Sequence, residues 1–124
     1  KAFGQPINRY GQIQKMIGDG YSMTEAARCL IYNVARNVSS TERNRIGSDA
    51  AKLFAAPVGK ILADNCMQIY GGAGYCREYP IERLLRDAKL IEIGGGTLES
   101  HQKNLTKDLT RHYLGNSLAE DFKR

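Results

Sequence analysis

Two clusters of glycine limit what this chain can fold into, because they interrupt a sequence that otherwise has the periodicity of helices. One cluster lies in residues 71–74 and the other in residues 94–96. Helices commonly end at such glycines, since glycine loses the most backbone freedom inside a helix. Elsewhere the apolar residues recur mainly at intervals of three, four and seven, which is typical of helices with one buried face. The sequence therefore predicts helices separated by glycine loops, with no alternating strand pattern.

Four helices are predicted, followed by a frayed tail after Gly115. The helices span Tyr10 to about Asn37, about Ser48 to Tyr70, Pro80 to about Lys89, and Thr97 to about Gly115. Ser48 and Thr97 suit helix N-caps, and Pro80 suits a first helical turn. Pro57 predicts a kink in the second helix. The expected fold is an all-α, up-and-down four-helix bundle that forms a single domain over residues 1–124.

Composition excludes several classes of protein. The chain has 124 residues with 42% apolar residues, which suits one globular domain rather than a disordered chain. Its apolar runs are too short to cross a bilayer. The net charge is +5, but both signs alternate along the chain, which favours solvated helix faces over a nucleic-acid groove. The N-terminus has neither an initiator Met nor an apolar signal core, so we expect a segment of a longer protein.

The glycine clusters carry the functional signal. A helix end needs only one left-handed residue, so three glycines within residues 71–74 indicate either a ligand that approaches the backbone or a tightly packed neighbouring helix. Residues 94–96 precede a predicted helix N-terminus, where free N–H groups favour an anion or a developing oxyanion. Neither cluster follows a strand or has the Lys-Ser/Thr pattern of a phosphate loop.

Four segments together resemble the C-terminal helical domain of the acyl-CoA dehydrogenases. They are FGQPI at residues 3–7, QIYGGAGY at 68–75, YPIERLLRDAK at 79–89 and IGGGT at 93–97. The resemblance covers Lys1 to about Arg111. It implies a flavoenzyme that uses FAD to dehydrogenate an acyl-CoA thioester between its α- and β-carbons, in a longer chain with an N-terminal helical domain and a middle β-domain.

The resemblance also implies where the chemistry lies. In this family a Glu carboxylate removes the α-proton. At the position where most members carry this Glu, the backbone N–H of the same residue donates to the thioester carbonyl. Gly95 stands at that position, so the donor is retained and no catalytic side chain is expected within this chain. The base is expected on a preceding helix, as in isovaleryl-CoA and long-chain dehydrogenases. Gly94, Gly95 and Gly96 are the implied substrate contacts, and the missing aromatic at Gly94 favours a branched acyl group.

The implied FAD contacts come from both glycine clusters and from the N-terminus: Phe3, Gln68, Gly71, Gly72, Thr97 and Glu99. The resemblance places Gln68, Gly71 and Gly72 against an FAD bound mainly by a neighbouring subunit. It therefore implies a homo-oligomer, a dimer or tetramer, and an electron-transfer flavoprotein as acceptor. No metal, nucleic-acid partner or membrane span is predicted. A reducing compartment, the cytoplasm or mitochondrial matrix, agrees with three cysteines that cannot all pair.

Two alternatives stay open. The vacated Glu position favours a catalytically silent acyl-CoA-binding homologue, and the positive charge favours a basic helical interaction module. The other notable side chains receive simple structural interpretations. We expect surface or interface histidines at His101 and His112, and core cysteines at Cys29, Cys66 and Cys76. Ion pairs along the third helix are expected from Glu82, Arg83, Arg86 and Asp87. Aromatic packing at the first glycine cluster is expected from Tyr70, Tyr75 and Tyr79.

Overall fold

Helices account for nearly all of the regular structure in the computed structural model, which describes residues 1–39, 41 and 44–115. The elements are η1 (Ile7–Arg9), α1 (Gly11–Arg36), α2 (Ile46–Tyr70), α3 (Gly72–Tyr75), α4 (Ile81–Ile93) and α5 (Leu98–Gly115). Within the described ranges there is no strand, only an isolated bridge between Ala2 and Gln5. The predicted all-α class with four main helices is confirmed. The predicted frayed tail lies outside the described residues.

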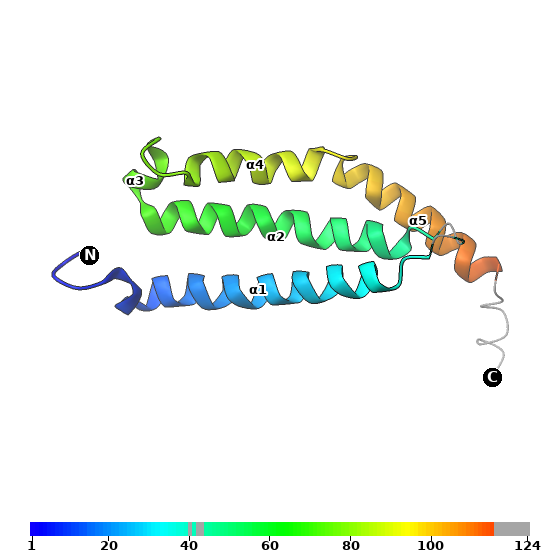
Figure 1. Ribbon diagram of the computed structural model, residues 1–124, viewed down its shortest axis with the longest axis horizontal. Helices are drawn as coiled ribbons and strands as arrows, with labels where there is room; N and C mark the ends of the chain where they lie inside the picture. The colour runs from blue at the N-terminus through cyan, green and yellow to red at the C-terminus, as the bar shows by residue number, and fades with distance from the viewer. Residues whose placement is uncertain (40, 42–43, 116–124) are drawn as a thin grey trace.

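Helix α2 is the centre of the arrangement. It lies between α1 and α4, and these three helices alternate in direction (Figure 1). Helix α5 continues beyond the end of α4 and packs against α2. As a result, the loop between α2 and α4 and the loop between α4 and α5 lie at opposite ends of α4 (Figure 1).

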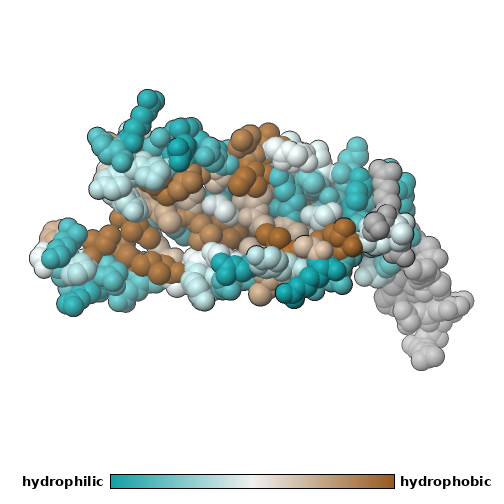
Figure 2. Space-filling model, in the orientation of Figure 1, coloured by the Kyte–Doolittle hydropathy of each residue, from teal (hydrophilic) through white to brown (hydrophobic). Residues whose placement is uncertain are grey.

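Small side chains form the core, so the helices approach one another closely. The buried apolar residues are Ala27, Ala51, Ala56, Val58, Ala63, Ile81 and Ala88. At Gly20 of α1 a Cβ atom would lie 2.9 Å from Cδ2 of Leu62 in α2, so this glycine permits the contact between the two helices. Many larger apolar side chains stay exposed, and Figure 2 shows a band of hydrophobic residues along the length of one face.

The helix ends match the sequence predictions only in part. Thr97 caps the N-terminus of α5 as predicted, because its Oγ1 accepts a hydrogen bond from the Ser100 N–H at 3.3 Å. The predicted Ser48 cap is wrong, since α2 already begins at Ile46, whose N–H donates to Asn44 Oδ1 at 3.0 Å. Helix α4 begins directly after Pro80 and extends one turn beyond Lys89. Helix α2 is continuous through Pro57, and a kink there stays a prediction.

The predicted core role of the cysteines is wrong. All three are free and exposed. Cys66 is exposed although Val58, about two turns before it on α2, is buried, a difference that the helical periodicity alone could not indicate. None of the helices in the described part of the chain is long and apolar enough to span a membrane.

Candidate functional site

The sequence-predicted site residues form two groups rather than one. Phe3, Gln68, Gly71 and Gly72 lie at the end of the molecule where α2 ends and α4 begins, and residues 94–99 lie at the other end of α4 (Figure 1). Helix α4 has 13 residues and therefore spans roughly 20 Å. We call residues 71–74 the first glycine loop and residues 94–96 the second glycine loop.

The first glycine loop contains one glycine that packing requires and two glycines in open surroundings. Gly71 ends α2 with a positive φ of 60°, and its N–H donates to the Met67 carbonyl at 2.9 Å. No atom lies within 4 Å of the place that a Cβ would occupy at Gly71 or Gly72. Gly74 differs, because a Cβ there would lie 2.8 Å from Tyr70 Cβ and 2.9 Å from the Met67 carbonyl oxygen. Gly74 is therefore required for packing, whereas Gly71 and Gly72 leave the backbone open to a ligand.

The N-terminal turn exposes an aromatic ring at the same end of the molecule. Ala2 and Gln5 exchange backbone hydrogen bonds of 3.0 and 3.2 Å, and Phe3 and Gly4 between them have φ values of 50° and 80°. This is a mirror-image hairpin turn, in which a bulky residue is unusual. The Phe3 side chain is 96% exposed. The turn therefore displays an uncovered ring from a backbone conformation that a bulky residue rarely adopts.

The second glycine loop presents unpaired backbone donors. Gly95 and Gly96 have φ values of 70° and 105°. In the part of the chain that the structure describes, the N–H groups of these two residues have no hydrogen-bond partner. They precede the N-terminus of α5, whose dipole favours negative charge. At Gly94 a Cβ would lie 3.2 Å from the Leu90 carbonyl oxygen, so a larger residue there would press against the end of α4.

Two polar side chains hold the carbonyl groups of the same loop. Lys52 Nζ of α2 donates to the Gly94 carbonyl at 2.9 Å and also to the Ile91 carbonyl. His101 of α5 places Nε2 3.3 Å from the Gly95 carbonyl oxygen and Nδ1 2.7 Å from Oδ1 of Asp49 in α2. The loop is thus attached to two helices through the Gly94 and Gly95 carbonyl oxygens. The Gly94 N–H donates to the Leu90 carbonyl at 2.7 Å, and among the described residues only the N–H groups of Gly95 and Gly96 stay without a partner in this loop.

The pairing of His101 corrects its interpretation as a surface residue, while a role at an interface stays a prediction. Its side chain is only 18% exposed and that of Asp49 is 5% exposed. The Oδ2 atom of Asp49 is buried without a partner among the described residues. Asp49 lies in the first turn of α2, where a negative charge is also favourable. Sequence reasoning missed the pair because 52 positions separate its members, although a buried-face Asp is itself a signal that a partner exists.

Glu99 lies exposed in the first turn of α5. The pKa of its carboxyl is lowered, first by a hydrogen bond with its own backbone N–H and then by the Thr97 side chain. Both causes act at the N-terminal end of α5, where a carboxylate is favoured. Glu99 therefore adds negative charge beside the second glycine loop.

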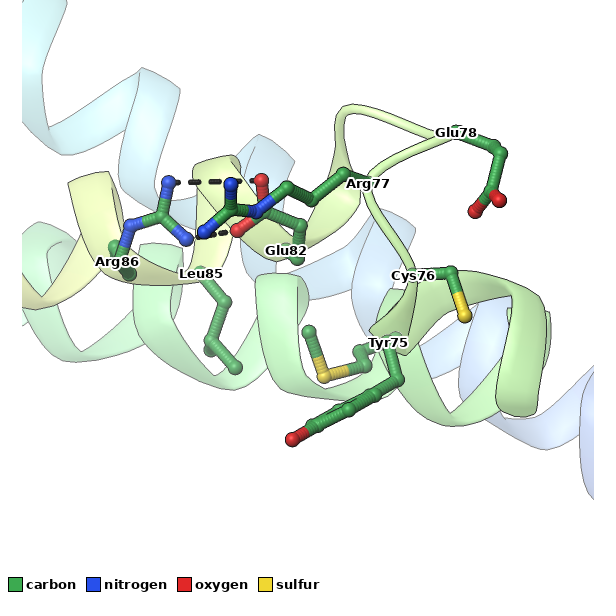
Figure 3. A pocket seen from close by; sticks show the side chains of 8 residues that line it. Tyr75, Cys76, Arg77, Glu78, Glu82, Leu85 and Arg86 are labelled. Carbon is green, nitrogen blue, oxygen red and sulfur yellow. Dashed lines mark hydrogen bonds and ion pairs between the residues drawn. The ribbon is translucent and has the colours of Figure 1, made fainter.

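A cavity of about 570 Å³ lies beside the first glycine loop, between the end of α2 and the start of α4 (Figure 3). None of the predicted site residues lines it; its lining is Met67, Tyr75, Cys76, Arg77, Glu78, Glu82, Leu85 and Arg86. Glu82 pairs with Arg86, one turn further along α4. The expected ion pairing on this helix is therefore confirmed for Glu82 and Arg86, whose partners are four residues apart. Among the described residues, Arg83 and Asp87 form no ion pair.

Aromatic packing near the first glycine loop is confirmed for one pair of tyrosines. The rings of Tyr70 and Tyr79 lie 5.3 Å apart at a tilt of 58°, a favourable geometry for aromatic side chains. Tyr75 does not join them and is 80% exposed.

Comparison with known proteins gives a consistent result. Residues 1–110 match the family described as "Acyl-CoA dehydrogenase, C-terminal domain". The chain is 35% identical over 111 residues to cyclohexane-1-carbonyl-CoA dehydrogenase of Geobacter metallireducens, covering 90% of this chain and 29% of that protein. It is 39% identical over 107 residues to mitochondrial isovaleryl-CoA dehydrogenase of Oryza sativa subsp. japonica, covering 86% and 26%.

Solved structures agree. Butyryl-CoA dehydrogenase from Megasphaera elsdenii superimposes with a TM-score of 0.83 at 32% identity, covering 90% of this chain and 29% of that one. The same values hold for a chain in the structure described as "Electron transferring flavoprotein of Acidaminococcus fermentans: Towards a mechanism of flavin-based electron bifurcation". This chain spans less than a third of the length of the relatives that it matches.

Proposed function

Because this chain belongs to the acyl-CoA dehydrogenase family, in which it matches the C-terminal domain, we propose that it forms part of an FAD-dependent enzyme that introduces a double bond between the α- and β-carbons of an acyl-CoA thioester. The observation that carries the proposal is the second glycine loop, whose Gly95 N–H is unpaired while the carbonyls beside it are held. An N–H in that state is available to the thioester carbonyl, where negative charge develops as the α-proton leaves.

The first glycine loop supports FAD binding. When bound, FAD accepts the hydride from the β-carbon. The exposed Gln68 side chain, the open backbone at Gly71 and Gly72, and the uncovered Phe3 ring offer hydrogen-bonding and stacking groups at one end of the molecule. Thr97 and Glu99 lie at the other end of α4. Of these two, Thr97 suits an anionic cofactor better, because Glu99 carries a carboxylate whose pKa is lowered.

The separation of the two groups of residues fits a shared site. They lie at the two ends of α4, roughly 20 Å apart, so we propose that one chain contributes to two different FAD sites in a homo-oligomer. The exposed apolar residues, among them Phe54, Ile61 and Leu90, support burial against a further chain or domain. Size measurement in solution by light scattering checks this, and a monomeric complete protein would contradict it.

We place the catalytic base outside this chain. Gly95 has a φ of 70°, a conformation that an L-residue such as glutamate adopts at a cost of about 1–2 kcal/mol. Among the described residues, Asp49 is paired with His101 on the carbonyl side of this loop, and Glu99 lies exposed in the first turn of α5. Because the chain has its greatest identity among the relatives named above with isovaleryl-CoA dehydrogenase, a glutamate on a preceding helix is the base that we propose.

The acyl group is proposed to be branched or otherwise wide. No atom lies within 4 Å of the Cβ position at Gly95, and this open position is the space that we propose for the acyl group. The names of two relatives support this choice, since isovaleryl and cyclohexane-1-carbonyl groups are both wider than a linear chain. An electron-transferring flavoprotein is the acceptor that we propose, supported by the similarity to a chain in the bifurcation structure.

The test is anaerobic flavin reduction by the complete protein with a panel of thioesters. We expect bleaching of the flavin by isovaleryl-CoA and cyclohexane-1-carbonyl-CoA, slower bleaching by a linear thioester, and reoxidation by an electron-transferring flavoprotein. Binding of acyl-CoA without bleaching would instead support the catalytically silent homologue. Salt-dependent binding of oligonucleotides without thioester binding would support the basic interaction module.

A further inference from the structure

The two peptide groups on either side of Gly95 are each held by a side chain from a different helix. Lys52 of α2 binds the Gly94 carbonyl, and His101 of α5 faces the Gly95 carbonyl. In a planar trans peptide the N–H points away from the carbonyl of the same unit, and no cis peptide occurs in the described chain. Holding the Gly94 carbonyl therefore also sets the direction of the Gly95 N–H.

We propose that Lys52 and His101 are positioning residues that hold the second glycine loop so that the Gly95 N–H stays directed at the thioester carbonyl. This inference rests on the proposed function, because the task that it assigns to Lys52 and His101 is to hold a donor to the thioester carbonyl. Lys52 acts on the peptide that carries the donor, and His101 acts on the peptide that follows it.

The loop needs such support because packing does not supply it. Three consecutive glycines have wide conformational freedom, and no atom lies within 4 Å of the Cβ position at Gly95. Hydrogen bonds from an ammonium group are stronger than those between neutral groups. Such a bond also polarises the peptide that accepts it, which makes the N–H on its other side a better donor.

Helix α2 controls both attachments. Asp49 and Lys52 lie about one turn apart on this helix, so they share a face. Asp49 is buried and accepts from Nδ1 of His101 at 2.7 Å, which fixes the ring with Nε2 toward Gly95. Both ring nitrogens face oxygen atoms, Nδ1 the Asp49 carboxyl and Nε2 the Gly95 carbonyl.

A purely structural role for Lys52 must be separated from positioning, since the ammonium also binds the Ile91 carbonyl in the last turn of α4 and a cation is favourable there. Asp108 provides a control for the attachment of α5. It accepts from Arg45, the residue directly before α2, at 3.1 Å and so links the start of α2 to α5, as the His101–Asp49 pair does, without touching the loop. Asp108→Asn weakens the attachment of α5 but leaves both carbonyls of the second glycine loop held.

The experiment uses the complete FAD-containing protein with Lys52→Met, Lys52→Arg, His101→Phe and Asp108→Asn. Removal of an oxyanion donor commonly lowers kcat by about 100- to 1,000-fold, so a misdirected donor in Lys52→Met is expected to lower kcat for flavin reduction at least about 10-fold, with a smaller change in KM. Lys52→Arg, which can still donate to both carbonyls, should recover most of that loss. His101→Phe should lower kcat less than Lys52→Met, and Asp108→Asn should leave it within about two-fold.

A crystal structure of Lys52→Met gives a readout that does not depend on activity. We expect the Gly94–Gly95 peptide to be rotated or to take several orientations. An unchanged peptide, a wild-type kcat in Lys52→Met, or an equal loss of kcat in Asp108→Asn would each overturn the inference. If no acyl-CoA reduced the flavin of the wild-type protein, the proposed function would be overturned instead. The crystal structure of Lys52→Met would still decide whether Lys52 orients the peptide.

Discussion

The two glycine loops have similar sequences and are built by different physical means. In the first loop Gly74 is buried against Tyr70 and Met67, so packing shapes the turn. In the second loop nothing packs near Gly95, and the backbone is held by Lys52 and by the His101–Asp49 pair. Glycine at one site is required because a side chain would collide, and at the other because φ is positive. Substitutions at Gly74 and at Gly95 are therefore expected to destabilise the protein for different physical reasons.

The largest effect is expected from removing the polar support of the second loop. His101→Leu leaves the buried Asp49 carboxylate without its partner, and breaking a buried pair in this way costs about 3–5 kcal/mol. Chemical denaturation of the complete protein measures the loss of unfolding free energy. The double variant Asp49→Asn with His101→Leu should recover part of it, and no recovery would show that the charge is not the cause.

Next in size is the packing requirement of the first loop. Gly74→Ala forces a Cβ to within 2.8–2.9 Å of Tyr70 and of the Met67 backbone, and overpacking of this kind costs about 1–3 kcal/mol. Gly72→Ala is the matched control, because no atom lies within 4 Å of its Cβ position. Thermal unfolding should therefore change little in Gly72→Ala, while its FAD affinity falls. Equal destabilisation by the two substitutions would remove the distinction drawn within this loop.

A smaller loss is expected at Gly95, where conformation rather than collision is limiting. Gly95→Ala should destabilise the protein by about 1–2 kcal/mol, since an L-residue resists a left-handed backbone. In Gly18→Ala, a helical position of α1 with equally open surroundings, stability should instead rise by up to about 1 kcal/mol. Urea midpoints of the two variants provide the comparison, and destabilisation of similar size in both would contradict it.

The smallest effect concerns Glu99. Because its carboxyl pKa is lowered in the folded protein, the carboxylate adds stability that is present above the ordinary pKa of a glutamate and is lost as the pH falls through the lowered value. Glu99→Gln should therefore lower the melting temperature slightly at neutral pH, with the difference from wild type vanishing in acid. If the difference in melting temperature between Glu99→Gln and wild type grew as the pH fell, the lowered pKa assigned to Glu99 would be wrong.

Much of the candidate site followed from local sequence. Thr97 was predicted as a cap because its hydroxyl reaches an N–H only three residues away. The resemblance to the acyl-CoA dehydrogenases rested on short segments, and the family match bears it out. The exposed cysteines were mispredicted because helical periodicity marks an apolar face but does not show whether anything covers it.

The sequence alone determined where helices form and where glycine interrupts them, because periodicity and capping act over a few residues. Only the tertiary structure decided that the two loops lie at opposite ends of α4, that Gly74 packs while Gly72 is open, and that His101 meets Asp49. Contacts between residues 52 positions apart depend on how helices are placed against one another. That placement is a property of side-chain packing over the whole domain, and no local pattern encodes it.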